Sequence, residues 1–571
     1  MPETDLVLMH APSVYDFRKR PSLLGPVSDV VPSTQVFEMY PIGFLTLLEY
    51  LQERGHRVRI ANVALRMLQS RSFDAERFIR KLNPRMFGLD LHWMVHAQGS
   101  LELAAIVKKY HPDTPVVFGG LSASYYHEEL MEYPQVDFVL RSDSTEESLD
   151  LLLTAVRDGD DLSEIPNLTW KRNGETVVNP WAEPPADLDH VSFDYAAVIR
   201  STMRHMDITG HLPFREWLDY PIVAALTCRG CVHGCVICGG SAAAFRKTSN
   251  RKAPAFRSPE VLARDIASAS RYMRAPIIVL GDILQAGEDC ARALLDAIKR
   301  EDVKNPIAFE FFAPPPADLL QAMGEAVPGF NIQMSPESHD EEVRRRFGRT
   351  YGNEPFEEAI RAALESGCAR FDVFFMIGIP GQTPQSVKDT VVYCEKLLDR
   401  FQPEFPGRVH PYISPLAPFL DPGSTAFEDP GTHGYRLFHR TVEEHRIAQL
   451  APSWKYTLNY ETEWMTRDDI VASTYEAALS LNRLKARHGL VAKETADRIE
   501  ARITAEWKVS DEIDRIRREK EGDERDRAVE KLMESFPTVG ASTLCDEHEM
   551  KWPTRLFRFR PLRMLGAVLT K

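Results

Sequence analysis

The sequence has no long hydrophobic run and few cysteines. None of its apolar stretches approaches the roughly 20 residues that a membrane-spanning helix needs, so we expect no transmembrane segment. The first five residues are acidic and precede only a short apolar run, which does not fit a secretory signal peptide. We therefore expect a cytoplasmic protein whose eight cysteines stay reduced instead of forming disulfides.

Basic stripes and dinucleotide fingerprints are also missing. Lysine and arginine total 69 against 83 acidic residues, a net charge of −14 at pH 7, and such a surface does not favour nucleic acid as a partner. No G-x-G-x-x-G motif follows a predicted strand, which argues against a dinucleotide cofactor. With 571 residues, 44% of them hydrophobic, the chain is long enough for three or four domains with their own cores.

Half of the cysteines stand within one stretch of eleven residues. Cys231, Cys235 and Cys238 follow the spacing C-x3-C-x2-C, which lets one loop place three thiolates around one face of an inorganic centre. Because iron–sulfur clusters are held by thiolates and a cubane has four irons, three near ligands without a fourth predict a [4Fe-4S] cluster with one iron open. A structural zinc site completed by His233 or Cys228 is the alternative.

Strand and helix patterns alternate over residues 5–157. Five short apolar runs, each followed by a helical pattern, predict a doubly wound parallel sheet of Rossmann-like type with ligands at the carboxyl ends of its strands. The loop after the fourth run holds two adjacent glycines, which allow a large ligand to approach the backbone. The predicted strands are 6–9, 57–61, 86–91, 115–118 and 136–140.

The alternation resumes between residues 222 and 427. Its six predicted strands fall short of the eight in a closed barrel, so we expect a partial, open (β/α)6 barrel with room for a large second cofactor. Beyond residue 429 helical periodicity takes over, with predicted helices at 468–488 and 492–518. The predicted strands are 222–226, 277–280, 307–311, 330–334, 371–377 and one near 409.

Several motifs resemble a known family. Pro41-Ile42-Gly43 at a helix start and Phe118-Gly119-Gly120 after a strand are similar to the cobalamin-binding domain that precedes many radical S-adenosylmethionine (SAM) enzymes. The three-cysteine loop and four later elements in the same order resemble the radical SAM core. These later elements are Gly281-Asp282, Ser335-Pro336-Glu337-Ser338 with the arginine-rich run at 344–349, the Gly-x-Pro-Gly-x-Thr run at 378–383 and the Pro-Gly-Ser ending at 418–424.

This resemblance implies three cofactors, namely a [4Fe-4S] cluster, SAM and cobalamin. The amine and carboxylate of SAM would complete the coordination of the open iron. The Asp-x-His-x-x-Gly signature that supplies a histidine to cobalt in other cobalamin proteins is absent, which implies cobalt without a protein ligand. For His92, and for His96 nearby, an ordinary packing or surface position is the alternative. The candidate contacts to the lower corrin face are His92, Trp93, Gly119, Gly120 and Ser122.

The SAM contacts implied by the resemblance lie on three elements. Two departures from the family pattern stand out, since Asp282 replaces a usual Glu and Ile237 replaces a usual aromatic residue before the last cluster cysteine. Cys228 stands where Ser is common, and we predict a structural role for it because a buried thiol packs like a small hydrophobe. The candidate residues are Gly281, Asp282, Glu337, Arg346, Gly378 and Pro380.

The implied activity is radical chemistry on a small molecule, with electrons from a reductant such as flavodoxin or ferredoxin. Methylation of an unactivated carbon, for instance in a natural-product intermediate, is favoured, because such a carbon is a poor nucleophile but can lose a hydrogen atom. Cyclisation or oxidation without methyl transfer is one alternative. A noncatalytic metal-binding or electron-transfer scaffold is another.

The predicted domains are a cobalamin-binding domain at 1–157, a connector with a small hairpin at 158–215, a radical SAM core at 216–429 and a helical domain at 430–571. The helical domain could close the active site and contribute substrate contacts. Its last stretch, 552–565, mixes basic and apolar residues. Such a segment suits either a peripheral membrane contact or packing against the fold with its arginines outside.

Overall fold

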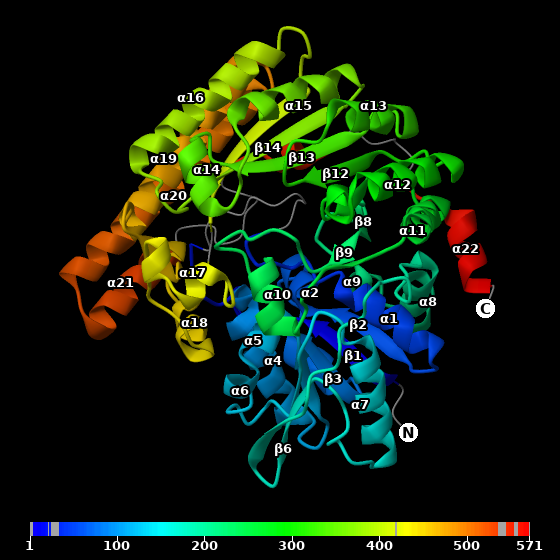
Figure 1. Cartoon of the computed structure of the whole chain (residues 1–571). Helices are drawn as coiled ribbons and strands as arrows, with labels where there is room; N and C mark the ends of the chain where they lie inside the picture. Colours follow the sequence, from blue (N-terminus) through cyan, green and yellow to red (C-terminus); the bar gives the residue numbers. More distant parts are fainter. Residues whose placement is uncertain are drawn as a thin grey trace.

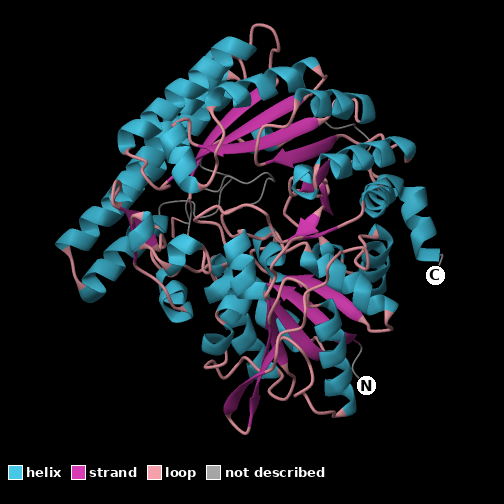
Figure 2. Cartoon of the chain, in the orientation of Figure 1, coloured by secondary structure: helices cyan, strands magenta, loops and turns pink. Residues whose placement is uncertain are grey.

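The computed structural model describes residues 4–20, 22–23, 34–416, 419–534, 544–552 and 558–569. Two large sheets, one from each half of the chain, lie one above the other; the upper sheet carries helices on its outer face, and the lower sheet has helices on both sides (Figures 1 and 2). The short elements β9 (Cys228–Arg229) and α10 (Ala242–Ser249) lie between them. The predicted order of an α/β domain, a second α/β domain and a helical region is confirmed.

The first sheet contains the five predicted strands in parallel, in the order β2-β1-β3-β4-β5. Its central strands are continuous apolar runs buried on both faces, which is typical of parallel sheets covered by helices on each side. The strands are β1 (Thr4–His10), β2 (Val58–Asn62), β3 (Pro84–Asp90), β4 (Val116–Gly119) and β5 (Phe138–Leu140). The helical elements are α1 (Gly43–Glu53), α2 (Val63–Gln69), α3 (Ala75–Arg80), η1 (Met94–His96), α4 (Ala97–Tyr110), α5 (Leu121–Tyr125), α6 (His127–Leu130) and α7 (Glu146–Asp158).

The hairpin predicted within the connector extends this first sheet. Its strands, β6 (Leu168–Arg172) and β7 (Glu175–Val178), turn through Asn173-Gly174, both at positive φ, and β6 pairs antiparallel with β5. The hairpin covers the backbone groups that β5 would otherwise expose at an edge. The following helices, α8 (Tyr195–His205) and α9 (Ile208–His211), pack on α1 and β2, so most of the segment predicted as a connector lies against the first sheet.

The second sheet has six parallel strands in the order β15-β14-β13-β12-β11-β8. Its first and last strands do not pair with each other, so the predicted partial barrel is confirmed. The strands are β8 (Val223–Leu226), β11 (Ile277–Leu280), β12 (Ile307–Phe311), β13 (Asn331–Glu337), β14 (Arg370–Ile377) and β15 (Val409–Pro415), and β10 (Ala255–Phe256) pairs with β9. The helical elements are α11 (Pro259–Tyr272), η2 (Ile283–Ala286), α12 (Glu288–Arg300), α13 (Ala317–Ala326), α14 (Glu341–Phe347), α15 (Asn353–Glu365) and α16 (Pro384–Phe401).

The last part of the chain is largely helical, as predicted. Helices α19 (Arg467–Arg487) and α20 (Lys493–Glu519) match the two expected ranges within two residues at each end, and α19 packs against α16, β14 and β15. No helix among the described residues is long and apolar enough to cross a membrane. The remaining elements are α17 (Thr425–Glu428), η3 (Gly431–His433), β16 (Tyr435–Leu437), α18 (Val442–Ala448), η4 (Trp454–Tyr456), β17 (Tyr460–Thr462), α21 (Gly522–Glu534), η5 (Glu547–Met550) and α22 (Pro561–Leu569).

The basic and apolar stretch at 552–565 is described only in part, since 553–557 lie outside the described residues. Trp552 is buried and its indole N–H donates to Asp372 at 3.0 Å. Helix α22 packs on α8 and α11 but leaves Leu562, Leu565 and Leu569 more than half exposed. The stretch therefore packs back against the fold, and a peripheral membrane contact stays a prediction.

Candidate functional site

The cysteine loop leaves the carboxyl end of β8 and is held from two sides. The Val236 N–H donates to the Phe347 carbonyl at the end of α14 (3.1 Å), and the Gly239 N–H donates to the Asp421 carboxylate (2.9 Å). Gly348, with φ of 118°, lies so close that a Cβ there would come within 3.2 Å of the loop backbone. The loop is thus fixed by the segments after β13 and after β15.

The three thiols line one cavity of about 450 Å³. Backbone N–H groups reach two of the sulfurs, from His233 to Cys231 at 3.4 Å and from Gly240 to Cys238 at 3.2 Å. Burial raises the pKa of all three thiols above their ordinary value. A metal centre that replaces the three protons would therefore be needed to hold them as thiolates.

The spacing of the thiols fits a cluster better than a single ion. Ligands of a tetrahedral zinc with bonds of about 2.3 Å to sulfur lie roughly 4 Å apart. Among the described residues, the only group of three or more possible ligands whose atoms all lie within 4.8 Å of one another is elsewhere, and it contains no cysteine. The zinc alternative is thus disfavoured by geometry, whereas a four-iron cluster needs wider spacing.

Charged side chains from two strands complete this cavity. Glu310 on β12 accepts from the Gly281 N–H at 3.0 Å, and Glu337 at the end of β13 has φ of 66° and lies 3.5 Å from Arg349. Burial raises the pKa of Glu337 to about 7, with Arg349 opposing the shift. Arg349 is 6% exposed, and its Nε and Nη1 have no hydrogen-bond partner. With Asp421, the cavity therefore has three carboxyl groups and an incompletely paired guanidinium in its lining.

The structure brings together only some of the predicted SAM contacts. Gly281 and Glu337 line the cysteine cavity. Asp282 does not, because its carboxylate caps η2 and accepts from the N–H groups of Leu284 (2.8 Å) and Phe312 (2.9 Å). In its place the carboxyl group that reaches the cavity is that of Glu310, on the neighbouring strand.

Arg346, Gly378 and Pro380 also lie outside the cavity lining. Arg346 is half exposed and pairs with Glu342 on its own helix. Gly378, at φ of 96°, donates to the Gln382 side chain within a buried turn. Arg349, three residues after Arg346, takes the inward position instead. The run of arginines at 344–349 was visible in the sequence, but only the folded helix end shows which of them faces inward.

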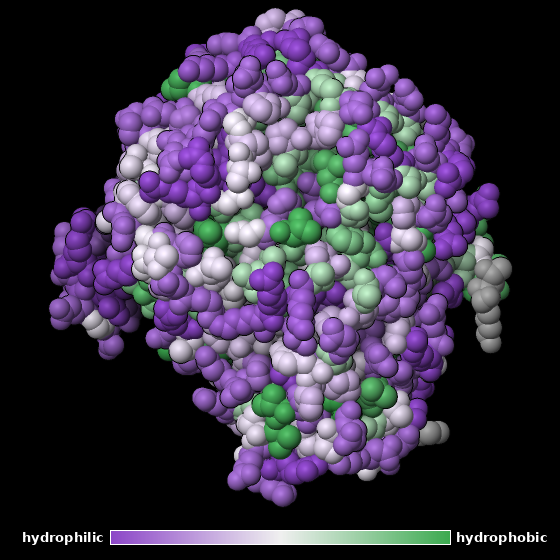
Figure 3. Space-filling view, viewed as in Figure 1, coloured by the Kyte–Doolittle hydropathy of each residue, from purple (hydrophilic) through white to green (hydrophobic). Residues whose placement is uncertain are grey.

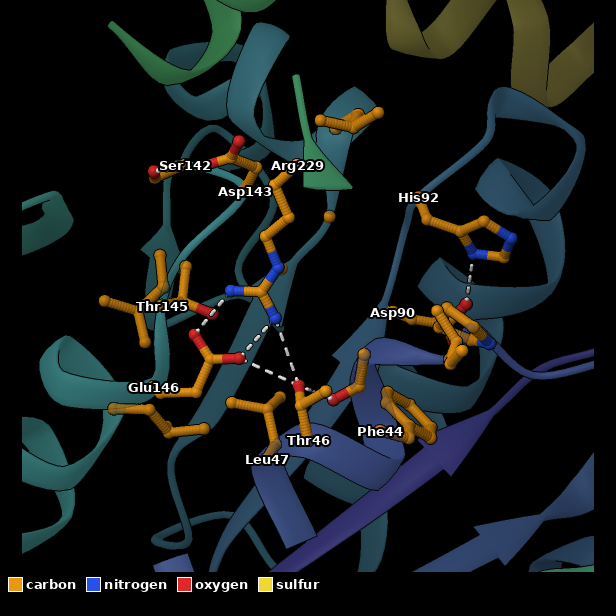
Figure 4. A pocket seen from close by; sticks show the side chains of 18 of the residues that line it. Phe44, Thr46, Leu47, Asp90, His92, Ser142, Asp143, Thr145, Glu146 and Arg229 are labelled. Carbon is orange, nitrogen blue, oxygen red and sulfur yellow. Dashed lines mark hydrogen bonds and ion pairs between the residues drawn. The ribbon is translucent and has the colours of Figure 1, made fainter. Parts of the chain in front are cut away.

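A second cavity of about 330 Å³ lies at the carboxyl edge of the first sheet (Figure 4). Its wall is mostly apolar and combines residues of β1, β3, β4 and α1 with β9. A Cβ added at Gly43 would meet nothing within 4 Å, and one added at Gly119 would meet only a carbonyl oxygen at 3.9 Å. The backbone at these two glycines therefore faces open space, which fits the face of a large ring such as a corrin.

Three of the five predicted cobalamin contacts line this cavity, namely His92, Gly119 and Gly120. Trp93 is 47% exposed and Ser122 is buried, and neither belongs to the lining. The Ser122 hydroxyl instead donates to the His92 carbonyl at 3.2 Å, so it supports the loop. The His92 ring turns toward Asp90, with its Nδ1 at 2.8 Å from the carboxylate (Figure 4).

A buried ion pair joins the two halves of the chain beside this cavity. Arg229 on β9 pairs with Glu146 at the start of α7 and is 2.9 Å from its second oxygen, and Thr46 donates to the same carboxylate (Figure 4). Burial opposes ionisation, yet Arg229 lowers the pKa of Glu146 to about 2. A second pair links Arg251 with Asp143 at 2.5 Å. Nothing in the sequence indicated these pairs, since their partners lie more than 80 residues apart.

The two cavities share one wall. Leu226 at the end of β8, Cys228 in β9 and Gly230 just after β9 line both of them. On the surface seen in Figure 3, hydrophobic residues gather near the centre, at the level between the two sheets, whereas the periphery is mostly hydrophilic. The site is therefore a pair of adjoining cavities, one lined by thiols and one by glycines.

Two segments of the sequence, which include residues that line these cavities, match known protein families. Residues 29–152 match the family described as the B12 binding domain, and residues 226–394 match the radical SAM superfamily. No curated protein matches the sequence significantly. The chain therefore combines a B12-binding domain with a radical SAM domain.

The chain is also similar to solved structures of enzymes described as radical SAM proteins. The cobalamin-dependent SAM radical enzyme OxsB, with aqua-cobalamin and SAM bound, has a TM-score of 0.53 at 13% identity, over 96% of this chain and 78% of that one. The radical SAM methyltransferase TsrM from Kitasatospora setae has a TM-score of 0.49 at 16% identity, over 69% and 73%. This chain belongs to the radical SAM proteins with an N-terminal B12-binding domain, as the sequence motifs predicted.

Proposed function

We propose that the protein is a cobalamin-dependent radical SAM methyltransferase that acts on an unactivated carbon of a small molecule. The observation that carries the proposal is the shared wall of the two cavities, formed by Leu226, Cys228 and Gly230. A substrate at this wall would be open to both cavities at once. When bound, the cluster with SAM supplies hydrogen-atom abstraction and cobalamin supplies methyl transfer.

The residues of the cysteine cavity have separate roles in this proposal. Cys231, Cys235 and Cys238 would hold a [4Fe-4S] cluster. Glu310 lies where it could accept hydrogen bonds from the amine of SAM, since it already accepts from the neighbouring Gly281 N–H. Arg349 would pair with the SAM carboxylate through an N–H of its unpartnered Nη1 or Nε, because hydrogen bonds between a guanidinium and a carboxylate are strengthened by their charges.

The first domain would present cobalamin across the apolar cavity. Gly119 would let the corrin approach the backbone, whereas Gly120, where a Cβ would come within 2.6 Å of the His92 backbone, lets the two loops pack together. His92 would pack at the rim of the corrin through its backbone and Cβ, because its ring is held by Asp90. The ion pair of Arg229 with Glu146 would keep the two domains in register. The apolar lining would exclude water and other polar molecules from the reacting groups.

Anaerobic turnover with SAM that carries a labelled methyl group tests this proposal. We expect extracts of the source organism to yield a labelled product together with S-adenosylhomocysteine and 5′-deoxyadenosine, as measured by mass spectrometry. The matched control is Cys231→Ala, which should form none of the three. Deoxyadenosine with an unlabelled, altered product would instead support cyclisation or oxidation. Wild-type protein that binds neither iron nor cobalamin would support a noncatalytic scaffold.

A further inference from the structure

A cluster of histidines lies behind the apolar cavity and is not used by the proposed reaction. His10 at the end of β1, Asp90 at the end of β3 and His96 in η1 are all buried, and one potential ligand atom from each lies within 4.8 Å of the others. His92 joins them through its Nδ1 at 2.8 Å from Asp90, and its ring centroid lies 5.1 Å from that of His96. Three imidazoles thus surround one carboxylate.

Backbone carbonyls fix which ring nitrogens point into the cluster. The His10 Nε2 lies 2.9 Å from the Phe37 carbonyl, and the His96 Nδ1 lies 3.1 Å from the Ala11 carbonyl. A carbonyl oxygen only accepts, so these two nitrogens carry the protons. Metal-binding histidines typically donate their outer N–H to a carbonyl or carboxylate in this way. The inner nitrogens, Nδ1 of His10 and Nε2 of His96, are therefore left to face the cluster.

The inner nitrogens lack a complete set of partners. The His96 Nε2 is buried in a residue that is 1% exposed and has no hydrogen-bond partner. The His10 Nδ1 faces both oxygens of Asp90, at 3.0 and 3.1 Å, and a lone pair opposite a carboxylate requires a proton or a cation between them. A single cation at the centre would satisfy both nitrogens and the carboxylate.

The spacing suits a zinc ion. Zinc ligands about 2.0–2.1 Å from the metal in a tetrahedron lie roughly 3.3 Å from each other, close to the nitrogen–oxygen separations found here. Imidazole nitrogen is a good zinc ligand, whereas calcium and magnesium prefer oxygen. His92 borders both the cluster and the cavity.

We propose that His10, Asp90 and His96 form a structural zinc site behind the B12-binding cavity. The ion would tie the segment after β1 to the segment after β3, and both segments support the cavity wall. This site is separate from the cysteine cavity and does not depend on the proposed methyl transfer. The carboxylate supplies one negative charge, and the neutral imidazoles supply the remaining ligands.

The test uses the full chain with its iron–sulfur cluster reconstituted. The protein is equilibrated with Zn²⁺, passed through a chelating column and analysed for zinc per chain by mass spectrometry, and its zinc K-edge absorption is recorded. We expect one retained zinc per chain, with nitrogen and oxygen neighbours at about 2.0 Å and no sulfur at about 2.3 Å. Loss of all zinc on the column, or a sulfur shell, would overturn the proposal.

Two variants separate coordination from folding. His96→Leu removes the unpartnered nitrogen, and we expect it to lose the retained zinc and the rise in melting temperature that zinc gives to the wild type. His211→Asn is the matched control, because His211 is equally buried but both of its ring nitrogens already have partners. It should retain zinc. A His96→Leu variant that still retains zinc with the same absorption spectrum would contradict the proposal.

Discussion

Removal of Arg229 should weaken the junction of the two sheets by a predictable amount. The Glu146 carboxyl, 4% exposed, has its pKa lowered from the ordinary 4.5 to about 2, a difference of roughly 2.5 units that corresponds to about 3 kcal/mol at 1.36 kcal/mol per unit. Breaking a buried pair typically costs about 3–5 kcal/mol because one charge stays buried and unpaired. We therefore expect Arg229→Met to lose about 3 kcal/mol in the free energy of unfolding at pH 7.

The shift in the pKa of Glu146 also predicts how the free energy of unfolding changes with pH. In the wild type the folded pKa of Glu146 lies below its unfolded value, so the contribution of the pair is fully present above pH 4.5 and is lost as the pH falls toward 2. In Arg229→Met burial, the largest influence on Glu146, is opposed only by the hydrogen bonds from Thr46 and from the backbone, so we expect the pKa of Glu146 to rise above 4.5. The variant should then gain stability as the pH falls from 7 to 5, while the pair still stabilises the wild type. The difference in the free energy of unfolding between the wild type and Arg229→Met should therefore become smaller as the pH falls from 7 to 5.

Urea titrations of the apoprotein, followed by tryptophan fluorescence at pH 7 and pH 5, measure this effect. Arg229→Met/Glu146→Gln should recover most of the loss, since no buried charge is left. Arg483→Met is the control, because its pair with Glu500 is 59% and 36% exposed and such pairs contribute less than about 1 kcal/mol. The reasoning is refuted if Arg229→Met lies within 1 kcal/mol of the wild type at pH 7, or if the double variant is no more stable than the single one.

Three further outcomes are expected at the cavities. Cys231→Ala should lose most of its iron and the broad absorption near 400 nm on anaerobic reconstitution, whereas Cys290→Ala, outside the cavity, should keep both; equal iron content would contradict cluster binding. Gly119→Leu should fill the open space at the apolar cavity and weaken hydroxocobalamin binding in equilibrium dialysis, with the far-ultraviolet circular dichroism unchanged. Arg349→Met should raise the Kd for SAM by about tenfold or more in calorimetry, since hydrogen bonds to charged groups contribute about 1.5–3 kcal/mol, whereas Arg346→Met should not.

The sequence predicted the elements that are local in the chain. Periodicity located all five strands of the first domain and all six of the second, and the spacing of three cysteines predicted the loop at the end of β8. These signals lie within a few residues of one another, and strong apolar runs in parallel sheets are little altered by tertiary context. The hairpin at 168–178 was also found, but not its pairing with β5, because strand pairing is a long-range choice.

The site residues that were missed depend on such long-range choices. Asp282 stood at the expected position in the chain, yet two backbone N–H groups hold its carboxylate at the start of η2, and Glu310 on β12 reaches the cavity. Arg349 was hidden in a run of arginines whose orientation is decided where α14 ends at Gly348. A motif can therefore locate the strand end at which a cavity forms, here that of β11, while the carboxyl group that lines the cavity comes from the neighbouring strand β12.

The same distinction explains why the cofactors can be inferred and the substrate cannot. None of the described residues beyond Asp421 lines either cavity, and α19 covers β14 and β15, so substrate contacts from the C-terminal helices stay a prediction. The shared wall and the loops around it include Leu226, Phe245 and Phe312, which come from three separate segments. Such a surface has no sequence signature. The thiol of Cys228, whose pKa burial raises to about 11, stays neutral in that wall and keeps it apolar between the two cavities.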